Sequence, residues 1–310
     1  MKSFLSTYGI ALALLLEVAL FAALSPFFFT AENLLNVTLQ VSITAIIAAG
    51  MTFVILTGGI DLSVGSMVAF SGVVAALVLH STLPFVLVVV LGFLAALGVG
   101  AASGWTAGWL VTRYRMAPFI VTLALMTVWR GAAFTVTEGR PVWGLAEGFS
   151  DIASARMLAI PLPTLLMAAV FVVAHVVLTS TRYGRAIVAV GGNREAARLA
   201  GVPVVRVLVS VYAISGLLSA LSGFLLASRM NSGQPNAGLM YELDVIAAVV
   251  VGGTSLSGGR GTIVCTLIGT LLIGVLRNGL NLLNVGSYVQ QILVGLVIVG
   301  AVLLDRSQRR

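Results

Sequence analysis

The chain alternates between long apolar runs and short polar or glycine-rich breaks over all 310 residues. Ten runs of about 15 to 28 residues are long enough, as helices, to cross most or all of the roughly 30 Å hydrocarbon layer of a bilayer. They cover residues 7–25, 34–57, 64–80, 84–111, 117–136, 162–179, 207–228, 243–257, 262–284 and 287–304. The pattern predicts an all-α, polytopic integral membrane protein with about ten transmembrane helices in a single transmembrane domain, 1–310.

The amino-acid composition predicts the same class. Hydrophobic residues make up 59% of the chain and charged residues 9%, whereas charged residues make up about 25% of a typical soluble domain. The run at 7–25 follows Lys2 and has two interpretations, a cleaved signal peptide or an uncleaved first helix. Because so many apolar runs follow it, we expect an uncleaved first helix.

The basic residues predict the orientation of the chain in the membrane. With the N-terminus inside, the breaks on the outer side contain only Arg140, Arg156 and Arg229. The inner breaks contain Arg113, Arg115, Arg182, Arg185, Arg194, Arg198, Arg206 and Arg260. Since basic residues concentrate in cytoplasmic loops, both termini are predicted to be cytoplasmic. The same bias explains the net charge of +7, so this charge does not indicate that the protein binds nucleic acid.

Two glycine-rich segments, "TGGIDLSVGS" at 57–66 and "VGGTSLSGGR" at 251–260, resemble each other. We expect a helix to break at Gly58 and Gly59, and another at Gly252 and Gly253, because glycine adopts left-handed geometry at low cost. The helices are predicted to restart with Asp61 or Ser63, and with Ser255 or Ser257, as N-caps. The run at 243–257 is therefore predicted to be a broken or half-length helix, which is tolerated only where protein or a water-filled cavity covers it.

The similarity of these two segments has three interpretations. Transporters are often built from internal repeats, but an inverted repeat needs opposite orientations and the predicted topology gives both segments the same one. The repeat is parallel, or one span is miscounted, or the match arises by chance in a glycine-rich chain.

Polar residues within the apolar runs are the candidates for a translocation path. A carboxylate near membrane depth costs about 2.5 to 3.5 kcal/mol, so Asp61 is either a functional or paired group or a solvated N-cap at the cytoplasmic surface. In the ninth run, the spacing of Arg277, Asn281 and Asn284 places them on one helical face, next to Asn278. Such donors and acceptors suit a hydroxylated substrate. Alternatively, the asparagines join helices or lie in the outer turn.

The segment 182–206 is predicted to be the longest cytoplasmic loop and to carry a short helix outside the membrane. Asn193 is a suitable N-cap, Gly201 a suitable left-handed C-cap, and Pro203 prevents continuation. This helix, 193–201, presents charged and small apolar side chains to a groove in a cytosolic partner, or else is a connector on the bilayer surface. The candidate docking residues are Asn193, Arg194, Glu195, Ala196, Ala197, Arg198, Leu199 and Gly201.

The chain has no candidate nucleotide or metal site in its sequence. Lys2 is the sole lysine, so a phosphate-binding loop of the GxxxxGK[ST] type is impossible. Any ATP used must therefore bind another subunit. Cys265 is the sole cysteine, and no metal-binding motif or cofactor motif is present. We expect no metal and no cofactor in this chain.

Four motifs carry a resemblance to a known family: "TGGIDLSVGS", "GGNREAARLAG", "YELDVIAAVVVGGTSLSGGRGTIVCTLIG" and "NGLNLLNVGSY". From about residue 40 to its end, the chain resembles the permease subunits of bacterial ATP-binding-cassette (ABC) importers for monosaccharides, and ribose permeases most of all. The resemblance implies the ABC-importer permease fold in a bacterial cytoplasmic (inner) membrane. It implies transport of ribose or a similar monosaccharide by alternating access.

The resemblance also implies partners. They are a cytosolic ABC ATPase that holds ATP and Mg²⁺, an extracytoplasmic sugar-binding protein, and a second permease in a homodimer or heterodimer. The segment 193–201 matches the helix that docks on the ATPase in such importers. One alternative is an ion-coupled secondary sugar transporter in which Asp61 or Asp244 carries a proton. An intramembrane enzyme is disfavoured, because no set of side chains recurs at catalytic spacing.

Overall fold

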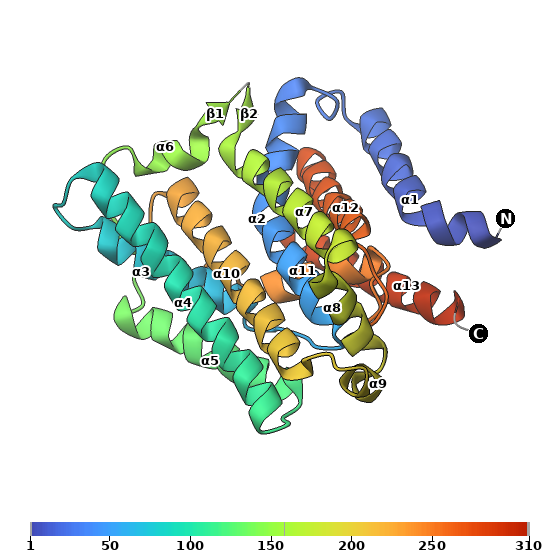
Figure 1. Cartoon of the computed structure of the whole chain (residues 1–310). Helices are drawn as coiled ribbons and strands as arrows, with labels where there is room; N and C mark the ends of the chain where they lie inside the picture. Colours follow the sequence, from blue (N-terminus) through green and yellow to red (C-terminus); the bar gives the residue numbers. More distant parts are fainter. Residues whose placement is uncertain (1, 158, 309–310) are drawn as a thin grey trace.

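A computed structural model describes residues 2–157 and 159–308, and this part of the chain is almost entirely helical (Figure 1). The outermost residues of the predicted cytoplasmic termini, 1 and 309–310, lie outside the described residues. Within the described part, six helices are long and apolar enough to cross a membrane. They are α2 (Ala31–Leu56), α4 (Phe85–Arg113), α5 (Pro118–Val136), α7 (Leu162–Ser180), α10 (Val204–Met230) and α12 (Ile263–Leu282).

Four further helices lie on the remaining predicted runs: α1 (Lys2–Leu24), α3 (Val64–Leu79), α11 (Tyr241–Val251) and α13 (Ser287–Gln308). The 16 residues of α3 and the 11 residues of α11 extend about 24 Å and about 17 Å at 1.5 Å per residue. Both are shorter than the hydrocarbon layer of about 30 Å. The half-length helix predicted in 243–257 is thus present, because α11 ends at Val251.

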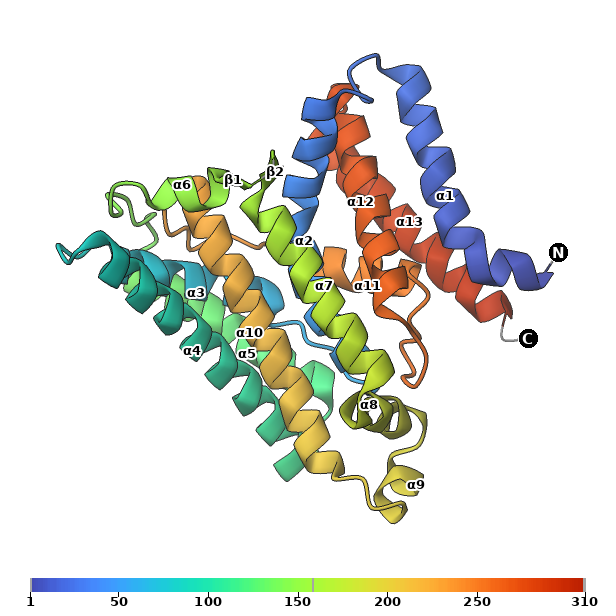
Figure 2. The same ribbon diagram turned by 45° about the horizontal axis from the view of Figure 1, so that its top comes forward.

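The connecting segments contain elements that the apolar pattern did not predict. At one end of the molecule lie α6 (Phe149–Ser154) and the antiparallel strands β1 (Arg156–Met157) and β2 (Ile160–Pro161). At the opposite end lie α8 (Arg182–Gly192) and α9 (Arg194–Leu199) (Figures 1 and 2). Helix α8 corrects the prediction of a single short helix in 182–206. Its buried residues Gly184, Ile187 and Val190 recur at helical spacing, which is the signal that predicts a packed amphipathic helix.

Helix α2 lies at the centre of the bundle and packs against α7, α10, α11 and α12. Its side chains are buried almost without interruption from Val41 to Leu56. Thr30 caps its start, because the Thr30 hydroxyl accepts a hydrogen bond from the Asn33 amide at 3.2 Å. A helix that is apolar all round is stable only when protein or lipid covers every face, and here protein covers most of them.

Helices α4 and α10 cross with their backbones in contact. A side chain at Gly104 would collide with the Tyr212 carbonyl, and one at Gly216 would collide with the Gly100 carbonyl. Small residues at the crossing let two membrane helices approach closely, and van der Waals packing then holds them. The outer helices expose large apolar side chains such as Leu15, Val86 and Val172, as expected of surfaces that face lipid.

Candidate translocation and docking sites

The first glycine-rich break, the α2–α3 elbow (57–63), turns at Gly58, whose φ is +74°. Asp61 is only 1% exposed. Its Oδ1 accepts hydrogen bonds from the Ser63 amide at 3.0 Å and the Ser63 hydroxyl at 2.6 Å, and its Oδ2 accepts one from the Ser215 hydroxyl at 2.9 Å. Asp61 is therefore a buried, paired group that joins the elbow to α10. The alternative of a solvated N-cap is wrong.

The second break, the α11–α12 elbow (252–262), begins at Gly252, the C-cap of α11, and turns at Gly253 with φ +86°. The predicted N-caps Ser255 and Ser257 are wrong. The Ser255 amide donates to the Arg260 carbonyl at 2.9 Å in a compact loop, so the next helix starts only after Thr262, whose hydroxyl accepts from the Cys265 amide.

The two elbows do not make the same turn. Gly58 aligns with Gly252 in the sequence, yet Gly252 has φ −60° and the first left-handed glycine after α11 is Gly253. Gly59, which aligns with Gly253, packs against α10, because a side chain there would collide with the Tyr212 hydroxyl. All four glycines lie in helix breaks as predicted, but the local geometry does not repeat.

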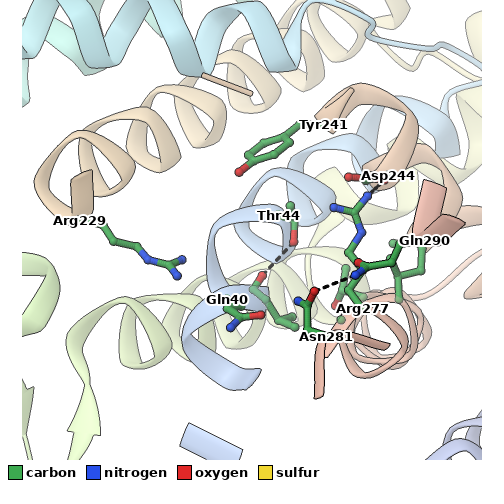
Figure 3. A pocket seen from close by; sticks show the side chains of 13 residues that line it. Gln40, Thr44, Arg229, Tyr241, Asp244, Arg277, Asn281 and Gln290 are labelled. Atoms are coloured by element: carbon green, nitrogen blue, oxygen red, sulfur yellow. Dashed lines mark hydrogen bonds and ion pairs between the residues drawn. The ribbon is translucent and has the colours of Figure 1, made fainter. Parts of the chain in front are cut away.

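A cavity of about 360 Å³ lies between α2, α10, α11, α12 and α13 (Figure 3). Its walls combine amide, hydroxyl and charged groups with apolar patches. The lining residues are Gln40, Val41, Thr44, Arg229, Tyr241, Asp244, Ala248, Thr270, Ile273, Gly274, Arg277, Asn281 and Gln290. This volume falls in the range of about 300 to 1,000 Å³ that is typical of small-molecule sites.

Two polar contacts order the wall formed by α11, α12 and α13. The Arg277 guanidinium donates to Asp244 Oδ1 at 2.6 Å and forms an ion pair with it. The Gln290 amide donates to Asn281 Oδ1 at 2.7 Å. Figure 3 shows Arg229 on the opposite side of the cavity from these residues. The cavity thus offers both donors and acceptors, as sugar hydroxyls require.

The structure separates the predicted path residues. Arg277 and Asn281 line the cavity. Asn278 is buried and forms a reciprocal amide pair with Asn33 of α2, at 2.9 and 3.0 Å. Asn284 follows the end of α12 with φ +56°, so it does not continue the helical face of 277 and 281. Asp61 lies in the α2–α3 elbow, outside this cavity.

Several cavity residues were not among the predicted path residues: Gln40, Thr44, Arg229, Tyr241 and Asp244. The signal that points to Gln40 is an amide within a long apolar run. Asp244 carries a similar signal, since it is a carboxylate near the start of the half-length helix. Their proximity to α12 depends on tertiary packing and has no local signature.

Helix α9 has the caps that the sequence predicts. Asn193 Oδ1 accepts from the Ala196 amide at 3.0 Å. Gly201 has φ +81°, and the amides of Gly201 and Val202 donate to the carbonyls of Arg198 and Ala197. This is the Schellman pattern, which satisfies the last carbonyls of a helix. Local capping therefore sets both ends of this short helix.

The side chains of α9 divide into an inner and an outer set. Ala197 is buried against the rest of the chain, while Leu199 is 75% exposed. Glu195 and Arg198 pair with each other at 2.6 Å in solvent, and this contact with Arg198 lowers the pKa of Glu195. Arg194 is exposed as well, but its guanidinium reaches the end of α2 and donates to the Thr57 carbonyl at 3.1 Å.

Residues 33–302 match the family described as "Branched-chain amino acid transport system / permease component". The chain belongs to this permease family. Ribose import permease RbsC of Bacillus subtilis is 50% identical over 302 residues, covering 97% of this permease and 92% of the relative. RbsC of Escherichia coli K12 is 46% identical over 312 residues, covering 99% of this permease and 96% of the relative. No solved structure gives a significant match.

A third relative, the L-arabinose ABC transporter permease AraH of Azospirillum brasilense, is 41% identical over 305 residues, covering 97% of this permease and 89% of the relative. Family and relatives are named for transport, and a long apolar bundle is what transport across a membrane needs. The permease is a multi-pass membrane protein, and its relatives argue against the alternative of an ion-coupled secondary transporter. Within the described residues, no cluster of three metal-binding side chains occurs.

Proposed function

We propose that this permease is the membrane subunit of an ABC importer that carries ribose, or a similar monosaccharide, into a bacterial cell. The observation that carries the proposal is the identity of 46% to 50% with ribose import permeases over nearly the whole chain. The cavity supports it, because its amide, hydroxyl and charged groups match the mixed hydrogen bonding of a neutral sugar.

In the proposed topology, ten membrane segments leave both termini and α8–α9 in the cytoplasm. The cavity then lies toward the outer side. Arg229 is in the last turn of α10, a helix that begins just after α9, and Asn281 is near the end of α12 opposite the second elbow. A sugar released by an extracytoplasmic binding protein would enter this cavity from outside.

The chain has no means of using ATP by itself, so the proposed importer includes a cytosolic ATPase that holds ATP and Mg²⁺. Glu195, Arg198 and Leu199, which are exposed on α9, form the docking surface for that ATPase. A second permease, in a homodimer or a heterodimer, completes the membrane part. Closure of the ATPase pair moves the α9 helices, opens the cavity outward and, after hydrolysis, lets it open inward.

The test is uptake of labelled ribose into proteoliposomes that contain the permease, its genome-neighbour ATPase and the neighbouring sugar-binding protein. ATP on the ATPase side should drive accumulation, and omission of either ATP or the binding protein should abolish it. ATP-driven uptake of another monosaccharide would keep the importer and change the substrate. Uptake that ignores ATP and follows a proton gradient would overturn the proposal.

A further inference from the structure

Three segments distant in sequence meet at the cytoplasmic end of the central helix. The Gly259 amide of the second elbow donates to the Leu56 carbonyl in the last turn of α2, at 2.9 Å. Gly191, in the last turn of α8, lies against the same carbonyl. We call this set, Leu56–Gly58, Gly191 and Gly258–Gly259, the glycine junction.

The glycine junction is packed so closely that Gly191 and Gly258 have no room for a side chain. A Cβ at Gly191 would collide with the Leu56 carbonyl oxygen, and a Cβ at Gly258 would lie 2.8 Å from the Gly58 amide nitrogen and 2.9 Å from the Gly191 carbonyl oxygen. The neighbouring Gly192 is different, because a Cβ there would meet no atom within 4 Å. A side chain thus has no room at Gly191 and has room at Gly192, although the Gly192 backbone also lies beside Gly259.

Arg194 adds a second link at the same place. It is the first residue of α9, and its Nη2 donates to the Thr57 carbonyl at 3.1 Å. Thr57 is the C-cap of α2, where the last carbonyls of a helix have no partner within the helix and favour a positive charge. The docking segment is therefore held to the end of α2 by a contact at Gly191 and a charged hydrogen bond at Arg194.

The glycine junction lies at the end of α2 and in the loop that follows α11, and both of these helices line the cavity. Helix α2 ends at Leu56 and carries Gln40 and Thr44 in the cavity wall; α11 leads into the second elbow and carries Asp244. Helices and close-packed backbone contacts compress little, so a displacement at one end passes to the other. A side chain in the contact, by contrast, would hold the segments apart.

We propose that Gly191 and Arg194 are positioning residues that transmit movement of the docking helix α9 to the cavity helices α2 and α11. The inference rests on the proposed function, since it takes α9 as the site where the ATPase binds. It adds that coupling passes through a direct backbone contact, apart from the exposed docking residues. Docking and coupling are then separable by mutation.

The experiment compares Gly191→Ala with its neighbour Gly192→Ala in the complete importer in proteoliposomes. Three quantities are measured for each: co-purification of the ATPase, the rate of ATP hydrolysis stimulated by the sugar-loaded binding protein, and the number of sugars imported per ATP. We expect Gly191→Ala to retain the ATPase but to import about tenfold fewer sugars per ATP, a size of effect common along coupling routes. Gly192→Ala should match the unsubstituted importer.

If the importer with Gly191→Ala does not assemble, the variant Arg194→Gln tests the inference instead. Its control is Arg185→Gln, at another exposed arginine. Arg194→Gln removes the bond to Thr57 without adding bulk, and the same loss of sugars imported per ATP is expected with the ATPase retained. Equal coupling ratios in Arg194→Gln and Arg185→Gln, or in the two glycine variants, would overturn the inference. Failure of the unsubstituted importer to bind the ATPase or to use ATP would instead overturn the proposed function.

Discussion

Asp244 and Arg277 form an ion pair at 2.6 Å that joins the first turn of α11 to α12 in the cavity wall. The Asp244 side chain is 10% exposed and that of Arg277 38% exposed, so water screens the pair only in part. A half-length helix has few turns with which to anchor itself. The pair therefore both orients the cavity and holds the start of α11.

Substitution of Asp244 by Ala should destabilise the permease by about 1–3 kcal/mol, because it leaves a partly buried charge without its partner. Thermal unfolding in detergent measures this loss, and sugar uptake should fall as well. The double variant Asp244→Ala with Arg277→Ala should lose less stability than the sum of the two single variants. Simple additivity would show that the two residues do not interact.

The pair Asn33–Asn278 joins helices and does not face the cavity. Asn278→Leu should reduce stability by about 1–3 kcal/mol, since it leaves a buried amide unsatisfied. The double variant Asn33→Leu with Asn278→Leu should recover part of that loss. The concentration of loaded binding protein that gives half-maximal uptake should not change in either variant, and a clear change would return Asn278 to the translocation path.

Asp61 should act through its hydrogen bonds to Ser63 and Ser215. Asp61→Ala leaves the Ser63 amide and the Ser215 hydroxyl without an acceptor, at a cost of about 1–3 kcal/mol each. Asp61→Asn keeps one carbonyl oxygen and should be milder in thermal unfolding. We expect both variants to reduce uptake while retaining the ATPase. Normal uptake by Asp61→Asn, with normal stability, would limit Asp61 to shaping the elbow.

The outer face of α9 offers a test of docking. The double variant Glu195→Arg with Arg198→Glu keeps the pair within the helix, so the helix itself should remain folded. It reverses the charges that the ATPase would meet, and specific interfaces reject misplaced charges at a cost of several kcal/mol. The ATPase should be lost on purification from membranes. Full retention would contradict the assignment of 193–201 as the docking helix.

Local signals predicted much of the fold. The ten apolar runs lie on ten helices, Asn193 and Gly201 cap α9 as expected, and the breaks fall at Gly58 and Gly253. These features depend on groups within one or two helical turns. The N-cap prediction fails at Ser255 and Ser257, because both residues belong to a compact loop. Helix α8 was missed, because its segment was predicted to be mostly loop.

The candidate site was predicted less completely. Arg277 and Asn281 were placed in the path and do line the cavity, but Asn284 left the helical face because α12 ends at Leu282. Asn278 has a partner 245 positions away, and Arg194 binds a carbonyl 137 positions away. Neither the hydrophobic periodicity of one run nor its capping residues indicate a hydrogen-bond partner so far away in the chain.

The amino-acid sequence by itself determined that this protein is a helical membrane protein with a short capped helix outside the apolar runs, because burial in lipid and capping act on neighbouring residues. Only the tertiary structure decided which polar groups share the cavity, which pair away from it, and which backbones meet at the glycine junction. Those outcomes depend on how the helices cross, and crossing is set by packing between segments far apart in the chain.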